Sequence, residues 1–362
     1  MKPVTSFPIA AACAAALALG ALAAPAGAAD FSGKRIELII PFGTGGGSDN
    51  WARFLAPRLQ AELPGKPVIV VKNVPGGGSI TGTNQFADRA SPDGLTVIGT
   101  SGSTQFPYLL GDRRVKYEYK DWHVILATPT GGVVYAQASL GAKSADDLKE
   151  LRGKRLIYGS QGATALDLLM SLSFEILGLE VKPVFGMKGR GPARLAFERG
   201  ESTLDWQTTA AYIRSVQPLV DKGTAVPLFT YGAVDDSGNL VRDPTFPNLP
   251  HFGEAYEKMH GKKPRGPAWN AWKAFFVAGF AAQKMIFLPK GTPRDVVDAW
   301  RQAADRMVRA PDFAQAAKKA LGNVDQGTGR RAETLAKLAT EVDPKATGWV
   351  RDWLTRKFNV KF

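Results

Sequence analysis

Cysteine and histidine, which often supply nucleophiles, proton carriers and transition-metal ligands, are scarce in this chain. Its 362 residues include one cysteine, Cys13, and three histidines, His123, His251 and His260. Cys13 falls in an N-terminal segment that we expect to be removed, which excludes a disulfide scaffold and cysteine catalysis in the remaining chain. The histidines lie far apart in the sequence and none has the spacing of a metal pair, so we expect no metal site and no cofactor.

Catalytic motifs and nucleic-acid-binding patterns are also missing. The chain contains neither Gly-x-Ser-x-Gly nor His-Glu-x-x-His, and its carboxylates are not clustered, so we expect that it is not an enzyme. Its formal net charge of +13 comes from charges scattered along the sequence, without a Lys/Arg block interleaved with aromatic residues. We therefore expect no nucleic-acid partner, and solubility alone is the alternative explanation for the basic charge.

The first 29 residues have the pattern of a signal peptide. Lys2 supplies a positive start, residues 9–22 are apolar, and residues 26–28 read Ala-Gly-Ala. This pattern predicts cleavage near Ala28 or Ala29 and a periplasmic location. A retained membrane anchor and a lipid attached at Cys13 are the alternatives. The apolar run is short and rich in alanine, and the three alanines before Cys13 make a poor acylation site, so export with removal of the leader is favoured.

Strands and amphipathic helices alternate along the rest of the chain, which is typical of an α/β fold with parallel-rich sheets flanked by helices. A first unit of strand, helix, strand, helix and strand is predicted over 35–41, 48–63, 67–72, a helix ending at 90, and 95–99. A second unit begins after about residue 130, with strands at 155–158, 181–185, near 204 and 225–230, and helices ending at 177, 199 and 221. Two domains follow from the two units: residues 30–127 plus 272–362, and residues 128–271.

The C-terminal third is predicted to return to the first domain. Residues 274–288 are apolar, but Gln283 and Lys284 interrupt them, so the run is too short to span a membrane. We interpret it as a buried crossing strand or a pair of strands. The last helix, which carries Trp349 and Trp353, is expected to pack over the first domain.

The loop after the first strand reads Phe-Gly-Thr-Gly-Gly-Gly-Ser-Asp over 42–49. Glycine permits a tight turn and a close backbone approach, and the N-terminus of the helix that starts near Ser48 attracts negative charge. In a parallel sheet, the loops at the carboxyl ends of the strands lie together, so residues 73–79 and 100–105 are expected beside it. These features predict an anion-binding loop.

A dinucleotide-binding loop and a ligand-free turn are the alternatives. Gly43-x-Gly45-x-x-Ser48 nearly matches the Rossmann pattern, but the second strand ends in Lys72-Asn73 and offers no acidic residue for a ribose. The Gly-Lys-Ser/Thr ending of a P-loop is absent. A ligand-free turn does not account for three consecutive glycines, which lose conformational entropy on folding.

The loops that should line a cleft carry no Arg or Lys. These loops are 42–49, 100–105 and 159–164. We therefore expect the charge of an anionic ligand to be met by backbone N–H groups, hydroxyls and ordered water. Lys72 and Arg190 flank the loops and are expected to be solvated. Asp49 is expected to pair with Arg53 on the same helix, and facing the cleft it would favour a ligand with an ammonium group.

Six segments of the chain resemble one known family. IELIIPFGTGGGSDNWAR, VIVVKNVPGGGSITG and SPDGLTVIGT resemble the N-terminal signature of the periplasmic solute-binding proteins of tripartite tricarboxylate transporters. KRLIYGSQGATALDLLM, FGMKGRGPARLAFERGESTLDW and FLPKGTP follow in the order of the same family. The chain departs from the family pattern at Gly43-Thr44, where the family usually has Pro-Pro, and at Gln161 and Ala163.

The resemblance implies a two-domain Venus-flytrap binding protein without catalysis. Such a protein would close on a small carboxylate, which could be a di- or tricarboxylate, an amino acid or an aromatic acid, and deliver it to the permease subunits of a tripartite transporter. We expect a monomer. Carried over by position, the ligand-binding residues would be Phe42, Gly43, Thr44, Gly45, Gly46, Gly47, Ser48, Asp49, Thr100, Ser101, Ser160, Gln161, Gly162, Ala163, Thr164, Gln207, Thr208 and Thr209.

Two other functions fit the same sequence. A receptor that presents its ligand to a membrane sensor would have the same fold and the same cleft. An exported enzyme acting on an anionic substrate would need a polarised nucleophile near Ser48, Ser101 or Ser160, and the sequence shows no base beside them. The sequence leaves open which carboxylate is bound and which membrane protein receives it.

Overall fold

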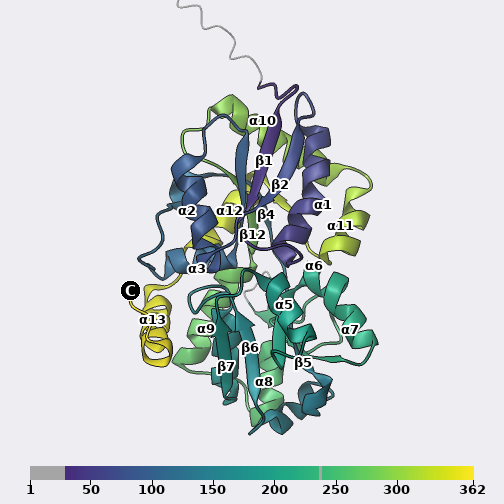
Figure 1. The fold of residues 1–362 in the computed structure, drawn as a ribbon, viewed down its shortest axis with the longest axis vertical. Helices are drawn as coiled ribbons and strands as arrows, with labels where there is room; N and C mark the ends of the chain where they lie inside the picture. Colours follow the sequence, from purple (N-terminus) through teal and green to yellow (C-terminus); the bar gives the residue numbers. More distant parts are fainter. Residues whose placement is uncertain (1–28, 236–238) are drawn as a thin grey trace, which may run out of the picture.

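The computed structural model describes residues 29–235 and 239–362, so the predicted signal peptide lies outside the described residues except for Ala29. The described chain forms two lobes, each built around one β-sheet with helices on its faces (Figure 1). A third, two-stranded sheet consists of β10 (Ala233–Val234) and β11 (Leu240–Val241). The predicted α/β class is confirmed.

The sheet of the first lobe has the strand order β13-β4-β12-β3-β1-β2. Its strands are β1 (Arg35–Ile40), β2 (Val68–Asn73), β3 (Thr96–Ser101), β4 (His123–Thr128), β12 (Lys284–Leu288) and β13 (Gly327–Thr328). The helices of this lobe are α1 (Gly47–Glu62), α2 (Ile80–Arg89), α3 (Gly102–Leu109), α10 (Arg294–Arg309), α11 (Phe313–Leu321) and α12 (Gly329–Thr340). β1 pairs in parallel with β2 and β3, as predicted, and β12, β4 and β13 extend the sheet by antiparallel pairing.

The core of the first lobe fixes which way the side chains of β12 point. Ile286 and Leu288 lie in the hydrophobic cluster that includes α1 and α10, whereas Met285 and Phe287 lie in the cluster on the other face of the sheet. Because successive side chains of a strand alternate between faces, Lys284 falls on the α1 face. It pairs with the last residue of β3, so it lies at the edge of the sheet where the parallel strands end.

The sheet of the second lobe has the order β7-β6-β8-β5-β9. Its strands are β5 (Gly132–Gln137), β6 (Leu156–Ser160), β7 (Val181–Phe185), β8 (Leu204–Thr208) and β9 (Ala225–Thr230). β6 pairs in parallel with β7 and β8, and β5 is antiparallel to β8 and β9. Its helices are α4 (Leu168–Leu177), α5 (Arg190–Glu198), α6 (Thr209–Ala211), α7 (Gln217–Asp221), α8 (Phe252–His260) and α9 (Pro267–Phe280), with a π turn at Tyr212–Val216 and short 3-10 turns at Ala138–Leu140 and Ala145–Leu151. Two further 3-10 turns, Gly77–Ser79 and Tyr119–Asp121, belong to the first lobe.

The interpretation of residues 274–288 as strands is wrong for its first half. Residues 274–280 continue α9, in which Trp269, Trp272 and Phe276 stack on one another at helical spacing. Only 284–288 is a strand, β12. Trp272 and Phe276 are buried against the rest of the second lobe and Trp269 is partly buried, so the hydrophobicity of this segment reflects a packed helix and not a buried strand.

The last helix, α13 (Pro344–Phe358), does not pack as predicted. Trp353 and Leu354 share one hydrophobic cluster with Trp272 and Phe275 of α9, so α13 lies against the second lobe (Figure 1). The predicted domain boundary at 271/272 falls inside α9. We propose that the boundary belongs at residues 281–283, where the chain leaves α9 and enters the first sheet.

The chain crosses between the two sheets along two segments that lie side by side. One runs from β4 to β5 at residues 129–131, and the other runs from α9 to β12 at residues 281–283. The N–H group of Thr130 donates to the carbonyl of Phe280 at 3.2 Å, and the N–H group of Gly102 donates to the carbonyl of Gln283 at 3.0 Å. These paired crossings hold the ends of β3 and β12 at the junction of the lobes.

Candidate ligand-binding site

A narrow cavity lies between the lobes, where strands of the two sheets end. Its lining comes from both lobes: Phe42, Gly46, Gly47, Ser48, Ser101, Ser103 and Gln283 from the first lobe and its crossing segment, and Gln161, Leu166, Arg190, Trp206 and Thr208 from the second. The centre of a water-sized sphere can occupy only about 20 Å³ of it. That volume suits one or two water molecules, so the lobes are closed on each other.

The glycine loop 43–47 contacts a second glycine loop, residues 186–191 of the opposite lobe. The N–H group of Gly43 donates to the carbonyl of Lys188 at 2.6 Å. A Cβ atom built on Gly191 would lie 2.4 Å from the carbonyl oxygen of Thr44, and one built on Gly47 would lie 1.8 Å from Oγ1 of Thr208. Side chains at Gly47 and Gly191 would therefore hold the lobes apart.

The N-terminus of α1 points its free N–H groups toward this cavity. The first N–H groups of a helix have no partner within the helix, and Gly46, the residue before α1, has no side chain to cap them. Gly47 and Ser48 in the first turn line the cavity. The carboxylate of Asp49 is occupied elsewhere, because it accepts from the N–H group of Gly45 at 2.9 Å and from Arg53 at 3.0 Å.

Asp49 thereby fastens the glycine loop to its own helix and to β2. Its Oδ1 atom also accepts from Nδ2 of Asn73 at 3.1 Å, and the same amide donates to the carbonyl of Phe42 at 3.0 Å. The predicted pairing of Asp49 with Arg53 is confirmed. The loop is held in shape before any ligand arrives, which lowers the cost of ordering it on binding.

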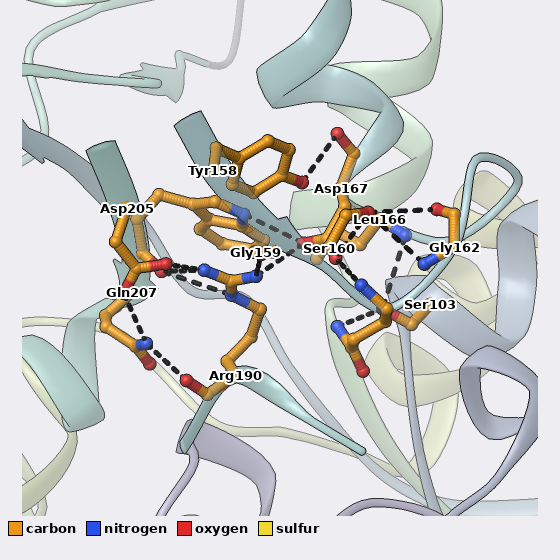
Figure 2. A network of polar contacts seen from close by, with 12 residues as sticks. Ser103, Tyr158, Gly159, Ser160, Gly162, Leu166, Asp167, Arg190, Asp205 and Gln207 are labelled. Atoms are coloured by element: carbon orange, nitrogen blue, oxygen red, sulfur yellow. Dashed lines mark hydrogen bonds and ion pairs between the residues drawn. The ribbon is translucent and has the colours of Figure 1, made fainter. Parts of the chain in front are cut away.

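Arg190 is buried beneath the cavity, and the prediction that it is solvated is wrong. Its side chain is 7% exposed and forms ion pairs with Asp167 and Asp205, both fully buried (Figure 2). Its guanidinium also donates to the carbonyl oxygens of Gly159 and Trp206. Two carboxylates and two carbonyls use this cation, so its charge is satisfied within the second lobe.

Asp167 organises the loop of the second lobe that faces the glycine loop. One of its oxygens accepts from the N–H group of Gln161 at 2.5 Å and from the hydroxyl of Ser160 at 3.2 Å. The other accepts from the indole N–H of Trp206 at 2.9 Å (Figure 2). The shape of the loop that follows β6 therefore depends on one buried carboxylate.

Contacts across the cleft link α3 to the same loop. The hydroxyl oxygen of Ser103 accepts from Nε2 of Gln161 and from the N–H group of Leu166, each at 3.2 Å (Figure 2). The hydroxyl of Thr164 donates to Asp112 at 2.9 Å, and Asp112 also pairs with Arg114. These contacts close the cleft on the side of α3, next to a larger cavity of about 330 Å³ that Gly162, Ala163 and Thr164 help to line.

Lys284 is the other cation at the junction of the lobes. It is 2% exposed, and among the described residues its only hydrogen-bond partner is the side-chain oxygen of Gln283. Its Cε atom lies 3.8 Å from the point where a Cβ of Gly47 would be. Burial lowers the pKa of Lys284 to about 7 from its ordinary 10.5.

The predicted site residues fall into three groups in the structure. The narrow cavity is lined by Phe42, Gly46, Gly47, Ser48, Ser101, Gln161 and Thr208, and the larger one by Gln161, Gly162, Ala163 and Thr164. The remaining predicted residues are outside both linings: Gly43, Thr44, Gly45, Asp49, Thr100, Ser160, Gln207 and Thr209. Several of these support the site, since Gln207 donates to the carbonyl of Arg190 at 2.6 Å and Thr209 accepts from the N–H group of Gly131 at 3.1 Å.

Sequence reasoning missed Ser103, Asp167, Gln283 and Lys284. The Gln-Lys pair that interrupts the apolar run 274–288 was the one available signal, because a polar pair inside a buried strand needs a reason to be there. Asp167 carried no such signal. Its role depends on Arg190 and Trp206, which are far away in the sequence.

Over 29–235 and 239–362, no group of three His, Cys, Asp or Glu side chains could hold a metal ion. In the same residues, no helix is long and apolar enough to cross a membrane.

Sequence comparisons place the chain among known binding proteins. A family model described as "Tripartite tricarboxylate transporter family receptor" matches residues 52–345. The chain is 28% identical over 311 residues to a UPF0065 protein of Bordetella pertussis, a match that covers 83% of this chain and 84% of that protein. A shorter match to Protein BugT of the same organism is 41% identical over 87 residues and spans only 24% of this chain and 26% of BugT.

Solved structures share the fold. The periplasmic binding protein BugD superposes with a TM-score of 0.67 at 21% identity, over 90% of this chain and 98% of BugD. MatC from Rhodopseudomonas palustris with bound malate gives 0.64 at 18% identity, over 88% of this chain and 98% of that one. R. palustris Rpa4515 with adipate superposes with a TM-score of 0.65 at 20% identity, over 88% of this chain and 99% of Rpa4515. The fold is thus that of the periplasmic binding proteins.

Replacing Asp167 by Asn should destabilise the protein strongly. The variant leaves Arg190 with one carboxylate fewer and points an amide N–H₂ group toward donors, and breaking a buried ion pair costs about 3 to 5 kcal/mol. Asp146→Asn is the matched control, because Asp146 is exposed, pairs with Lys258 on the surface and should contribute less than about 1 kcal/mol. Urea unfolding measures both, and equal losses would contradict the role assigned to Asp167.

The stability of the wild type should rise with pH relative to Lys284→Met. Because burial lowers the pKa of Lys284 to about 7 in the folded state, the unfolded state binds more protons between pH 7 and its ordinary pKa of 10.5. The free energy of unfolding should therefore increase across this window, by at most about 1.4 kcal/mol per pH unit. Urea unfolding of both proteins from pH 6 to pH 10 measures the difference, and a constant difference would show that Lys284 does not titrate there.

Proposed function

Because the chain belongs to the tripartite tricarboxylate transporter family of receptors, we propose that it captures a small carboxylate between its lobes and delivers it to the permease subunits of such a transporter. In this proposal the leader is removed near Ala28 or Ala29 during export, and the mature protein works in the periplasm as a monomer. The ligands named for the two R. palustris proteins, malate and adipate, make a dicarboxylate the first class to test.

The observation that carries the proposal is the cavity at the uncapped N-terminus of α1. Gly47 and Ser48 offer backbone N–H groups there, and the helix dipole favours negative charge at this end. Hydroxyls of Ser101 and Thr208 line the same cavity, and Phe42 and Trp206 supply apolar surface. This combination suits an anion with a short hydrocarbon part.

Closure of the lobes would couple binding to delivery. In this structure the cavity has room for only about one or two water molecules, so a dicarboxylate must enter with the lobes apart and the lobes must close around it to a wider cavity than this one. A ligand that contacts both lobes favours the closed state by its difference in affinity for the two states. A permease that recognises the closed form would then receive only loaded protein.

We propose no catalytic activity for this site. The hydroxyl oxygen of Ser101 accepts from the N–H group of Ser103 as the cap of α3, and the hydroxyl of Ser160 donates to Asp167. Neither serine has a histidine or lysine as a hydrogen-bond partner among the described residues. The carboxylate that Ser160 contacts is already paired with Arg190, and a hydroxyl without a free base is a weak nucleophile, so the alternative of an exported enzyme has no support from these contacts.

A carboxylate should raise the unfolding temperature of the mature protein. The protein is first unfolded and refolded to remove bound ligand, and is then heated with malate, adipate, tricarboxylates, amino acids, aromatic acids, phosphate or the matched uncharged amides. A ligand present at 100 times its Kd stabilises by about 2.7 kcal/mol, which is a visible shift. A shift with one carboxylate class and none with its amide is expected. The proposal fails if no carboxylate shifts the midpoint.

Gly191→Ala should weaken binding of the carboxylate found in that panel. Gly191 is helical, so the variant should fold, but its Cβ would lie 2.4 Å from the carbonyl oxygen of Thr44 when the lobes close. Overpacking of this size costs about 1 to 3 kcal/mol, which is about five- to 150-fold in affinity.

Gly348→Ala is the control for this variant. Gly348 is also helical, is exposed on α13 and lines neither cavity, and a Cβ there would meet no heavy atom within 4 Å, so calorimetry should give an affinity close to that of the wild type. Equal affinity of Gly191→Ala and wild type would mean that binding does not require the closed contact between the two glycine loops.

A further inference from the structure

Lys284 lies next to residues that line the narrow cavity. Leu288, Ile286 and Lys284 of β12 lie on the face of the sheet that α1 covers. Lys284 is the first residue of this strand and lies at the end of the sheet that faces the second lobe. The neighbouring residue, Gln283, lines the cavity. The Lys284 side chain reaches Gly47, since its Cε atom is 3.8 Å from the point where a Cβ of Gly47 would be.

The ammonium group of Lys284 has no counter-ion among the described residues. It has three donors, and the amide oxygen of Gln283 accepts one of them. The charged groups on the elements packed around it are committed elsewhere: Asp49 on α1 pairs with Arg53, and Asp205 on β8 pairs with Arg190. Lys284 thus differs from Arg190, whose charge is fully used inside the second lobe.

A second polar group at the same point also lacks a partner. Oγ1 of Thr208 is buried and makes no hydrogen bond within the part of the chain that the structure describes, and it lies 1.8 Å from the point where a Cβ of Gly47 would be. Lys284 comes from the first lobe and Thr208 from the second, and Gly47 lies between them in the first turn of α1. Buried polar groups are nearly always hydrogen-bonded, so an unpartnered hydroxyl beside an unpaired ammonium indicates a missing partner.

We propose that Lys284, Thr208 and the N–H groups of the first turn of α1 form a carboxylate site, in which the ammonium of Lys284 pairs directly with the ligand. This inference rests on the proposed function and deepens it. It replaces the expectation that only backbone, hydroxyls and water meet the ligand's charge. One carboxylate oxygen would accept from Lys284, and the other from Thr208 and the helix N-terminus.

The same arrangement makes closure depend on the anion. When the lobes separate, Thr208 withdraws from Gly47 and water can reach the ammonium. Closing without a ligand buries an unpaired charge, which opposes closure, and closing on a carboxylate buries an ion pair. Amides and other neutral isosteres would leave the ammonium unpaired. The site would therefore discriminate against them in two ways, because the buried charge opposes closure and the direct contact is weaker.

Lys284→Met tests this proposal, because it keeps the length of the side chain and removes the charge. Calorimetry measures the affinity of wild type and variant for malate and adipate and for the corresponding uncharged diamides. Loss of one partner of a buried charge pair predicts at least about 30-fold weaker binding of the acid. The variant should bind the diamide at least as well as the wild type does, because no unpaired ammonium then opposes closure, so the ratio between acid and amide should collapse. A side chain that only fills space would change both ligands equally.

Lys290→Met is the control for the loss of a positive charge. Lys290 lies just after β12, is exposed and pairs with Asp121 on the surface, so its replacement should leave the acid-to-amide ratio unchanged. Lys284→Gln serves as a second variant that keeps a hydrogen-bond donor next to Gln283. If both Lys284 variants keep the wild-type ratio, the inference is wrong while the proposed function stands. If no acid binds the wild type, the proposed function fails and this inference fails with it.

Discussion

The site depends on the approach of two backbone loops, one from each lobe, to a distance that only glycine permits. The loop 43–47 touches the start of α5 through Gly43 and Gly191 and the end of β8 through Gly47, and a methyl group at Gly47 or Gly191 would collide with the opposite lobe. This contact brings the N-terminus of α1 to Thr208 and confines the cavity. The glycines of the loop 43–47 therefore permit the contact between the lobes as well as a close approach of the backbone to an anion.

The two buried cations of the cleft have opposite roles. Arg190 is neutralised by Asp167 and Asp205 and holds the second lobe's loop in one shape whether or not a ligand is present. Lys284 is held at the junction with a single amide acceptor, so its charge awaits a partner. In the proposed mechanism, the preorganised second lobe and the unpaired cation together favour closure on an anion.

Much of the fold could be predicted from local sequence patterns, and the contacts between distant residues could not. The parallel units of both sheets follow from strands and helices that alternate along the chain. The sequence predicts one strand region over 274–288, where the structure has the end of α9 and then β12. The two are hard to separate because stacked aromatic residues at helical spacing and a short buried strand are both apolar. Within the site, the consecutive glycines predict the loop 43–47, and the pattern of a helix start predicts the place of Ser48. Arg190 was misjudged because its two carboxylate partners lie 23 and 15 residues away along the chain, in α4's N-terminal flank and β8.

The central claim is that a carboxylate bound between the lobes holds them closed. Small-angle X-ray scattering of the ligand-stripped protein during titration with a stabilising carboxylate tests it most directly. The account predicts a radius of gyration that falls to the value of the closed structure as the site saturates, and no fall with the uncharged amide at the same concentration. A radius of gyration that stays constant while calorimetry shows a saturated site would contradict it.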